Sequence, residues 1–533
     1  MWAVRRREVF SISMIHIQLR SSSIRGGALL LPLHECARGS RKDCPMVVDA
    51  RDEGGFAPAL DDRHPWGWTP GLVVALVSLV LVLEALTMSY LMVSMSIPLV
   101  AAHYGTTQGA WLLTTFLLVG GVTAPVIGKL ADMYGKRRLL LVCASAGSLG
   151  AVISAVAGSY GVMLLGRGVS GLLVSVLFLS YSLIRDVFPR NKVALAVSIA
   201  TSGMGLVSIP APFLSGWLLD AYGFRSLFWF LAVLLAVLVC LIAVSTDESP
   251  VRLRSRLDLL GAALLGGGIA GVLIAVSVGP GYGWTDTRTV SSAIGGTVML
   301  CAWVVSARRV PAPLVDLRVL GKRSVFSTVL GAGLAYGSAG VVAILLPLLA
   351  TTPASMGLGY GFGSTAKQLA LLQAPMGIMV VVGGVTVGLL VSRGYRPRTM
   401  LAAGMATMTA GYLLMAWNHS SAGFVVLACG VLGVGMGFAY AAIPNLVIEA
   451  VAPELQASTA SIVGVSQNVF PAILPVVIFS VLNANFVVSH APDGVFYVDA
   501  GYRVGFLIGA AATMTCVLVA LSIPRSIVQT SAR

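Results

Sequence analysis

Fourteen long apolar stretches follow one another from Gly71 onward, and they restrict the fold of this 533-residue chain more than any other feature. Each has about 17 to 28 residues, enough for a helix to cross about 30 Å of hydrocarbon. Lipid offers no partners for backbone N–H and C=O groups, so such stretches cross as helices. We therefore expect an all-α, polytopic membrane protein with 14 transmembrane helices, near residues 71–98, 109–130, 139–157, 160–183, 193–218, 226–245, 259–279, 290–306, 325–351, 368–392, 399–417, 423–447, 458–482 and 502–523.

The composition excludes most other classes of protein. With 57% hydrophobic residues, 11% charged residues and a mean hydropathy of +0.90, the chain has more apolar surface than a water-soluble core can hide. The net charge of +14 comes from short loops and includes no basic stripe with interleaved aromatic residues, so we expect no nucleic-acid partner. Cys36 and Cys44 near His34 lack the close paired spacing of a metal site, and we expect no metal ion, disulfide or cofactor.

The charges of the loops give the expected orientation. If the amino terminus is cytoplasmic, the inner loops carry 18 Lys and Arg residues and the outer loops carry 4. Positive residues gather on the cytoplasmic side of membrane proteins, and one missed helix would reverse every later loop. The pattern predicts an even number of spans, with both termini in the cytoplasm and the chain in the plasma membrane.

Changes in composition suggest the domain boundaries. We expect a leader without structure at 1–70, with Met46 as a possible true start, and a cytoplasmic tail at 524–533. The spans divide into a six-helix bundle at 71–245, a linker with two extra helices at 246–324, and a second six-helix bundle at 325–523.

A charged turn joins the second and third predicted spans. It contains Gly128, Asp132, Gly135, Lys136 and Arg137, with Arg138 behind them. Such a turn is typical of a transporter rather than a membrane enzyme, because it places a carboxylate and several cations where helices must slide. The stretch 388–398 is a degraded copy in which Ser392 replaces the acid, as expected of a duplicated bundle.

With this turn, the chain resembles the major facilitator superfamily, and within it the fourteen-helix drug:proton antiporter branch. The resemblance implies that Gly128, Asp132, Gly135, Lys136 and Arg137 form a conformational latch at the cytoplasmic end. Physically, the carboxylate of Asp132 can cap a neighbouring helix terminus in one state and leave it in another. The alternative is that these charges only set the topology.

Two ionisable residues lie deep in predicted spans, Glu84 in the first and Arg167 in the fourth. Helix geometry places them at depths within about 3 Å of each other, so they could meet and couple to protons. Residues 167–171 resemble the family's fourth-helix motif, whose arginine is linked to proton transfer. The family's usual first-helix acid would fall on Ser89. The alternatives are that Arg167 extends to the surface and that Glu84 is protonated between helices.

The fifth predicted span contains Gly205, Pro210, Pro212 and Gly216, in a stretch similar to the antiporter signature Gly-Pro-x-x-Gly-Gly. The prolines predict a bend, and the resemblance implies export; ordinary packing of small residues is the alternative. Several other residues are weaker candidates for a substrate cavity, with helix packing as the alternative: Met88, Met92, Gln373, Asn445, Gln467 and Asn468.

The expected function is secondary active transport, by alternating access, of amphiphilic small molecules or drugs out of the cell in exchange for protons. We expect a monomer in the lipid bilayer, with small-molecule substrate and protons as its partners. An importer, a uniporter and an exporter of lipids or metabolites on the same scaffold remain open. A polytopic membrane transferase is a remote alternative, because acidic residues in the loops are scattered and no phosphate-binding loop is present.

Overall fold

The computed structural model describes residues 68–106, 111–208, 210–252, 257–311, 313–451, 456–491 and 494–523. The expected leader, with Met46, falls almost entirely outside the described residues, and so does the expected tail at 524–533. The division at 71–245, 246–324 and 325–523 stays a prediction. Below, residues 70–245 are called the N half and residues 323–523 the C half.

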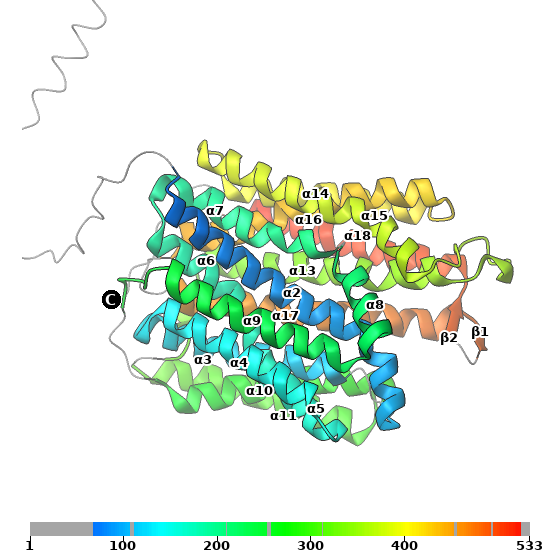
Figure 1. The fold of residues 1–533 in the computed structure, drawn as a ribbon, viewed down its shortest axis with the longest axis horizontal. Coiled ribbons are helices and arrows are strands. Elements are labelled where there is room, and N and C mark those ends of the chain that lie inside the picture. The colour runs from blue at the N-terminus through cyan, green and yellow to red at the C-terminus, as the bar shows by residue number, and fades with distance from the viewer. Residues whose placement is uncertain are drawn as a thin grey trace, which may run out of the picture. The chain divides into compact units, whose positions relative to one another are not determined.

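The N half contains helices that follow the first six predicted spans (Figure 1). They are α2 (Pro70–Tyr104), α3 (Trp111–Tyr134), α4 (Lys136–Ala155), α5 (Tyr160–Ser170) with the 3-10 turn η1 (Gly171–Ser175) and α6 (Val176–Val187), α7 (Arg190–Ser202) with η2 (Gly203–Ser208) and α8 (Pro210–Tyr222), and α9 (Arg225–Ser245).

The remaining spans are also helical. The central pair is α10 (Leu259–Tyr282) and α11 (Thr287–Arg309), followed by the short α12 (Leu317–Leu320). The C half contains α13 (Arg323–Thr351), the turn η3 (Ala354–Met356), α14 (Ala366–Ser392), α15 (Pro397–Trp417), α16 (Ala422–Ala450), α17 (Gln456–Asn485), β1 (Val487–Ala491), β2 (Gly494–Tyr497) and α18 (Asp499–Ser522).

Among the described residues, 13 helices are long and apolar enough to cross a membrane. The all-α polytopic class is confirmed. The fifth predicted span is not among these 13, because it is described in separate parts and residue 209 between them lies outside the described residues. It is divided into α7, η2 and α8. The proline at the start of α8 has no N–H to give to the preceding turn, which accounts for the interruption.

Two short strands were not expected from the sequence. β1 and β2 pair antiparallel between α17 and α18, in what reads as a polar loop. Figure 1 shows the pair at the right-hand end, beyond the end of α17. They mark the end of the molecule opposite to the start of α17.

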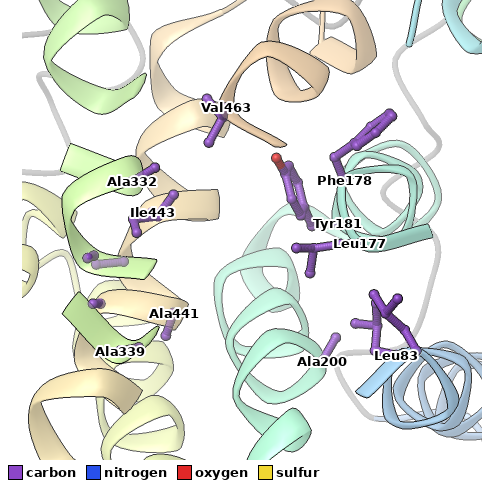
Figure 2. Close-up of a cluster of buried hydrophobic side chains, with 14 of the residues drawn as sticks. Leu83, Leu177, Phe178, Tyr181, Ala200, Ala332, Ala339, Ala441, Ile443 and Val463 are labelled. Carbon is purple, nitrogen blue, oxygen red and sulfur yellow. The ribbon is translucent and has the colours of Figure 1, made fainter. Parts of the chain in front are cut away.

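The two halves meet in an apolar core. Figure 2 shows Leu83 and Ala200 of α2 and α7 on one side and Ala339, Ala441 and Ile443 of α13 and α16 on the other. The central pair packs outside this core, with α10 against α3 and α17. Within the pair, a Cβ atom at Gly271 would lie 2.6 Å from the Cα of Gly296, so both positions need glycine.

Candidate functional site

Asp132, near the end of α3, joins the N half to the C half. Its carboxylate accepts the backbone N–H groups of Ala457 at 3.0 Å and Ser458 at 2.7 Å, and also the hydroxyl of Ser458. These N–H groups belong to the first turn of α17, where a helix has unsatisfied donors and a positive dipole end. Only 2% of Asp132 is exposed. The contact is the helix-terminus cap that the sequence predicted for this residue.

Gly128 lets α3 approach α17 one turn before Asp132. A Cβ atom there would lie 2.6 Å from Cβ of Ser461 and 2.7 Å from the carbonyl oxygen of Ala457. Backbone cannot move aside cheaply, so this position accepts no larger residue without separating the two helices. Gly135 has φ +117°, which opens the tight turn into α4.

Lys136 and Arg137 both contact residues of the N half. The ammonium group of Lys136 lies 2.5 Å from Asp186 Oδ2, with both side chains buried, and the Ser249 hydroxyl donates to the same oxygen. The Arg137 guanidinium donates to the carbonyl of Ala243. The three charged residues therefore do not share the same partners. Asp132 contacts α17 of the C half, whereas Lys136 stays in the N half and attracts the negative charge of Asp132 from there.

The sequence reading missed the acids that hold this turn in place. Glu248 accepts the backbone N–H groups of Arg137 at 3.0 Å and Arg138 at 3.1 Å and so caps the start of α4. Asp186 and Glu248 belong to the loop acids that look scattered in the sequence. The sequence could have indicated them by their position next to the predicted inner ends of spans. Only the fold shows which groups they contact.

Three further hydrogen bonds join the halves near the same end. The Arg185 guanidinium donates to the amide oxygen of Gln456, and the Tyr181 hydroxyl donates to the Ala460 carbonyl at 3.4 Å. The Asn445 amide donates to the Ser198 hydroxyl at 3.1 Å, so this cavity candidate links α16 to α7 in the present state. From here on, we use the word latch for the observed contacts of Asp132, Gly128, Arg185 and Asn445 with the opposite half, rather than for the turn residues grouped from the sequence.

The degraded copy at 388–398 lacks such a carboxylate. Gly388 packs against α7, where a Cβ atom would lie 2.8 Å from the Cβ of Ser198. The Ser392 hydroxyl donates to Leu389 of its own helix at 2.8 Å. The second turn therefore positions helices without joining the halves through an acid.

Arg167 is buried, with 1% exposure, and contacts no carboxylate among the described residues. Its Nε donates to the carbonyl of Leu112 at 3.2 Å, and its two terminal nitrogens donate to the hydroxyl and carbonyl of Ser89 at 3.2 and 3.4 Å. The guanidinium carbon lies 4.4 Å from the ring centroid of Phe116. Ser89, at the place of the family's usual acid, is thus the direct partner of this arginine.

The expectation that Glu84 and Arg167 meet is wrong for this state of the molecule. Glu84 lies about 140° round α2 from Ser89, the residue that Arg167 contacts, because five residues separate them on the helix. Glu84 faces η2 instead: a Cβ atom on Gly203 would lie 3.4 Å from its Oε1, and the backbone of Val207 acts on its charge.

Glu84 is 5% exposed, and neither carboxyl oxygen makes a hydrogen bond of good geometry with the described residues. A buried polar group without partners is costly, so such positions are kept mainly where they bind something. Glu84 therefore lies against the interrupted helix with the capacity to hold a proton or a water molecule.

We expect Ser89→Ala to destabilise the protein by about 2 kcal/mol, since a hydrogen bond to a charged group contributes about 1.5 to 3 kcal/mol. The change leaves one terminal nitrogen of Arg167 without its hydroxyl acceptor in the apolar interior. Thermal unfolding of the purified protein in detergent would measure it. Ser94→Ala is the matched control, because the Ser94 hydroxyl donates only to Leu91 of its own helix; equal unfolding temperatures of the two variants would contradict the prediction.

The residues of the antiporter-like motif have different surroundings. Gly205 fits closely against α14, where a Cβ atom would lie 2.8 Å from the carbonyl of Gly377. Pro210 begins α8 and Pro212 follows within its first turn, so the helical stretch is divided at the place where the prolines predicted a bend. Gly216 has no neighbour within 4 Å of such a Cβ atom, and no close helix approach requires it.

The residues predicted to line a substrate cavity differ in their surroundings. Met88 and Met92 are 8% and 0% exposed inside an apolar cluster of the N half with Met163 and Phe228, which fits the packing alternative. Asn468 donates to Gly464 of its own helix at 2.7 Å, and Gln373 is half-buried on α14.

Gln467 keeps the features of a binding group, and so does a buried tyrosine that the sequence did not single out. Gln467 is 5% exposed and its amide oxygen has no hydrogen-bond partner among the described residues. The buried hydroxyl of Tyr336 also lacks one, and its ring lies 4.5 Å from that of Tyr440. Tyrosines within apolar spans gave no signal in the sequence, because aromatic residues are ordinary in packed helices.

A family model decides the classification: the model described as Major Facilitator Superfamily matches residues 77–475. The chain belongs to the major facilitator superfamily. Its fold agrees with that of the human organic anion transporter MFSD10 (TETRAN), with a TM-score of 0.59 at 15% identity over 85% of this chain and 100% of that one. The proton:xylose symporter XylE gives a TM-score of 0.54 at 14% identity, over 83% and 94% of the two chains.

Curated members of the superfamily are more similar in sequence. Multidrug resistance protein Stp of Mycobacterium tuberculosis is 27% identical over 401 residues, which are 74% of this chain and 73% of Stp. The multidrug resistance protein B homolog of the same organism is 28% identical over 392 residues, 69% of this chain and 68% of that protein. An uncharacterised MFS-type transporter of M. tuberculosis is 28% identical over 354 residues, 64% of this chain and about half (49%) of that protein.

Proposed function

We propose that this superfamily member is a proton-coupled exporter of amphiphilic small molecules that works by alternating access of its two halves. The observation that carries the proposal is the contact of Asp132 with the first turn of α17. It joins the halves at one end by hydrogen bonds, and such bonds can be made in one state and broken in another. Two relatives named for multidrug resistance support the substrate class.

The coupling proton would bind to Glu84. This carboxyl group lies against η2, the interruption of the helix that also packs on α14 of the opposite half. A change in its charge would alter the cost of burying it and thereby the position of η2. Arg167 acts as a fixed cation, held by Ser89 and Leu112, that orients α2, α3 and α5 around this region.

The orientation is part of the same proposal. The latch would lie at the cytoplasmic end and the β1–β2 pair at the outer end, with both termini in the cytoplasm and the protein in the plasma membrane. The basis is the gathering of Lys and Arg in the loops at the latch end.

The proposal is tested in everted membrane vesicles with an internal acid gradient. Addition of a transported amphiphile should release protons from the vesicles, and collapse of the gradient with an ionophore should stop its accumulation. Accumulation that continues after the gradient is collapsed would exclude proton-coupled export and favour a uniporter. Proton movement in the same direction as substrate would favour an importer of the symporter type.

A further inference from the structure

An open groove lies on the side of the N half, between the end of α8 and the start of α9. Its volume is about 520 Å³. α8 contributes Leu218 and Tyr222, and α9 contributes Arg225, Ser226, Trp229 and Val233. Tyr222, Trp229 and Val233 are 68%, 47% and 61% exposed, so the groove is open to whatever surrounds the N half, and its walls are mainly apolar.

The groove lies at the end of the N half opposite to the latch. α9 has 21 residues and is therefore about 30 Å long, the thickness of the hydrocarbon layer. Its far end lies beside the turn that carries Asp132, because the Arg137 guanidinium donates to the carbonyl of Ala243 there. The start of α9 thus lies where the span leaves the hydrocarbon. Exposed Trp and Tyr side chains are typical of this level of a membrane, and Trp217 (58% exposed) stands beside Tyr222.

The guanidinium of Arg225 is the group that the groove offers to a polar ligand. The Ser226 hydroxyl is already used, since it donates to the carbonyls of Leu218 at 3.0 Å and Gly223 at 2.7 Å. Arg225 is exposed, and one terminal nitrogen donates to the carbonyl of Ala157 at 2.9 Å. This bond fixes the position of the guanidinium but uses one of its five N–H groups. Among the described residues, no carboxylate pairs with it.

The charge of the groove is therefore positive. Asp220 is the acid nearest to it in the sequence, and it stands two residues from both Leu218 and Tyr222 on α8. Two residues correspond to about 200° round a helix, so Asp220 faces away from the wall that these two residues form. A guanidinium binds phosphate oxygens well, and a long apolar wall beside it suits an alkyl chain. One molecule that carries both features, with a net negative charge, is an anionic phospholipid.

We propose that this groove binds one anionic phospholipid of the surrounding bilayer, with the headgroup phosphate on the guanidinium of Arg225 and an acyl chain along Trp229 and Val233. Such a lipid joins the end of α8 to the start of α9. Through the bond from Arg225 to Ala157 it also reaches the segment that follows α4. Only the assignment of the lipid to the outer leaflet rests on the proposed function, because the orientation belongs to it.

Fluorescence quenching of the full-length protein in a neutral detergent tests the site. Phosphatidylglycerol with brominated acyl chains is the probe, and the part of the quenching that disappears in Trp229→Phe reports contact with the groove. We expect saturable quenching, stronger than that by brominated phosphatidylcholine, whose phosphate is balanced by its own cation. Arg225→Gln should bind phosphatidylglycerol at least about tenfold more weakly, since a bond to a charged group is lost. Arg225→Lys should keep the preference for the anionic lipid.

Arg288→Gln is the matched control, because Arg288 is also an exposed arginine beside a tyrosine, 4.8 Å from the ring centroid of Tyr282; it should bind like the wild type. If Arg225→Gln does not fold, Val233→Phe at an exposed position should weaken binding by narrowing the groove. Equal affinity for phosphatidylglycerol in the wild type and these variants, or equal quenching by the two lipids, would overturn the proposal. Displacement by inorganic phosphate would also overturn it and indicate a site for free anions.

These measurements need neither a transported substrate nor a proton gradient. Failure of export in vesicles would therefore leave their result unaffected, and a failure to bind lipid would leave the proposed export untouched.

Discussion

Replacing Asp132 by asparagine is expected to open the latch and abolish export. The carboxylate accepts three donors from the first turn of α17 and places a negative charge at its positive end. Asparagine keeps one acceptor and turns an amide NH2 group towards the remaining N–H donors. A loss of about 3 kcal/mol, the upper range for a hydrogen bond to a charged group, corresponds to about a 100-fold shift between the two states of the latch.

Hydrogen exchange at the amides of Ala457 and Ser458 measures this shift directly, because these are the N–H groups that Asp132 accepts. We expect their exchange to quicken by up to about 100-fold in Asp132→Asn, with a parallel loss of transport in vesicles. Asp220→Asn is the matched control, since Asp220 is an exposed carboxylate on α8 that takes no part in the latch. Unchanged protection of both amides in Asp132→Asn would show that this contact does not hold the halves together.

Replacing Glu84 by glutamine is expected to separate transport from the proton gradient. Glutamine has nearly the same size but cannot bind and release a proton, so the position beside η2 is kept in one charge state. Gradient-driven accumulation in everted vesicles should fall to that of vesicles without the protein. Exchange of substrate down its own gradient should continue, because the helices and the latch are unchanged.

Glu449→Gln provides the control for this result, because Glu449 is exposed near the end of α16. It should transport with the same dependence on the proton gradient as the wild type. If Glu84→Gln keeps full gradient-driven accumulation at equal protein levels, the coupling proton binds elsewhere.

Local properties of the sequence predicted most of the helices. Each stretch is long and apolar enough to require internal hydrogen bonding in lipid, and a helix is the solution that a single segment can reach alone. The proline at 210 marked the place where the fifth span is interrupted. The strands β1 and β2 gave no such signal, because they are short and pair only with each other.

The candidate site was predictable only in part. Residue type and depth singled out Glu84, Arg167 and Asp132, since charges are expensive in apolar spans wherever they occur. Their partners could not be read in the same way. Asp132 binds residues 325 and 326 positions later in the chain, and Arg167 binds Ser89, 78 positions earlier.

The sequence by itself thus determined the membrane-spanning helical class, the superfamily turn at 128–138 and the few charged residues that such a chain can hide. Hydropathy and cost of burial act residue by residue, so they are visible without a fold. Tertiary structure alone decided that Asp132 caps α17 and that Glu84 and Arg167 lie apart. These contacts depend on the angle and height at which helices pack, and neither quantity is written in any one segment.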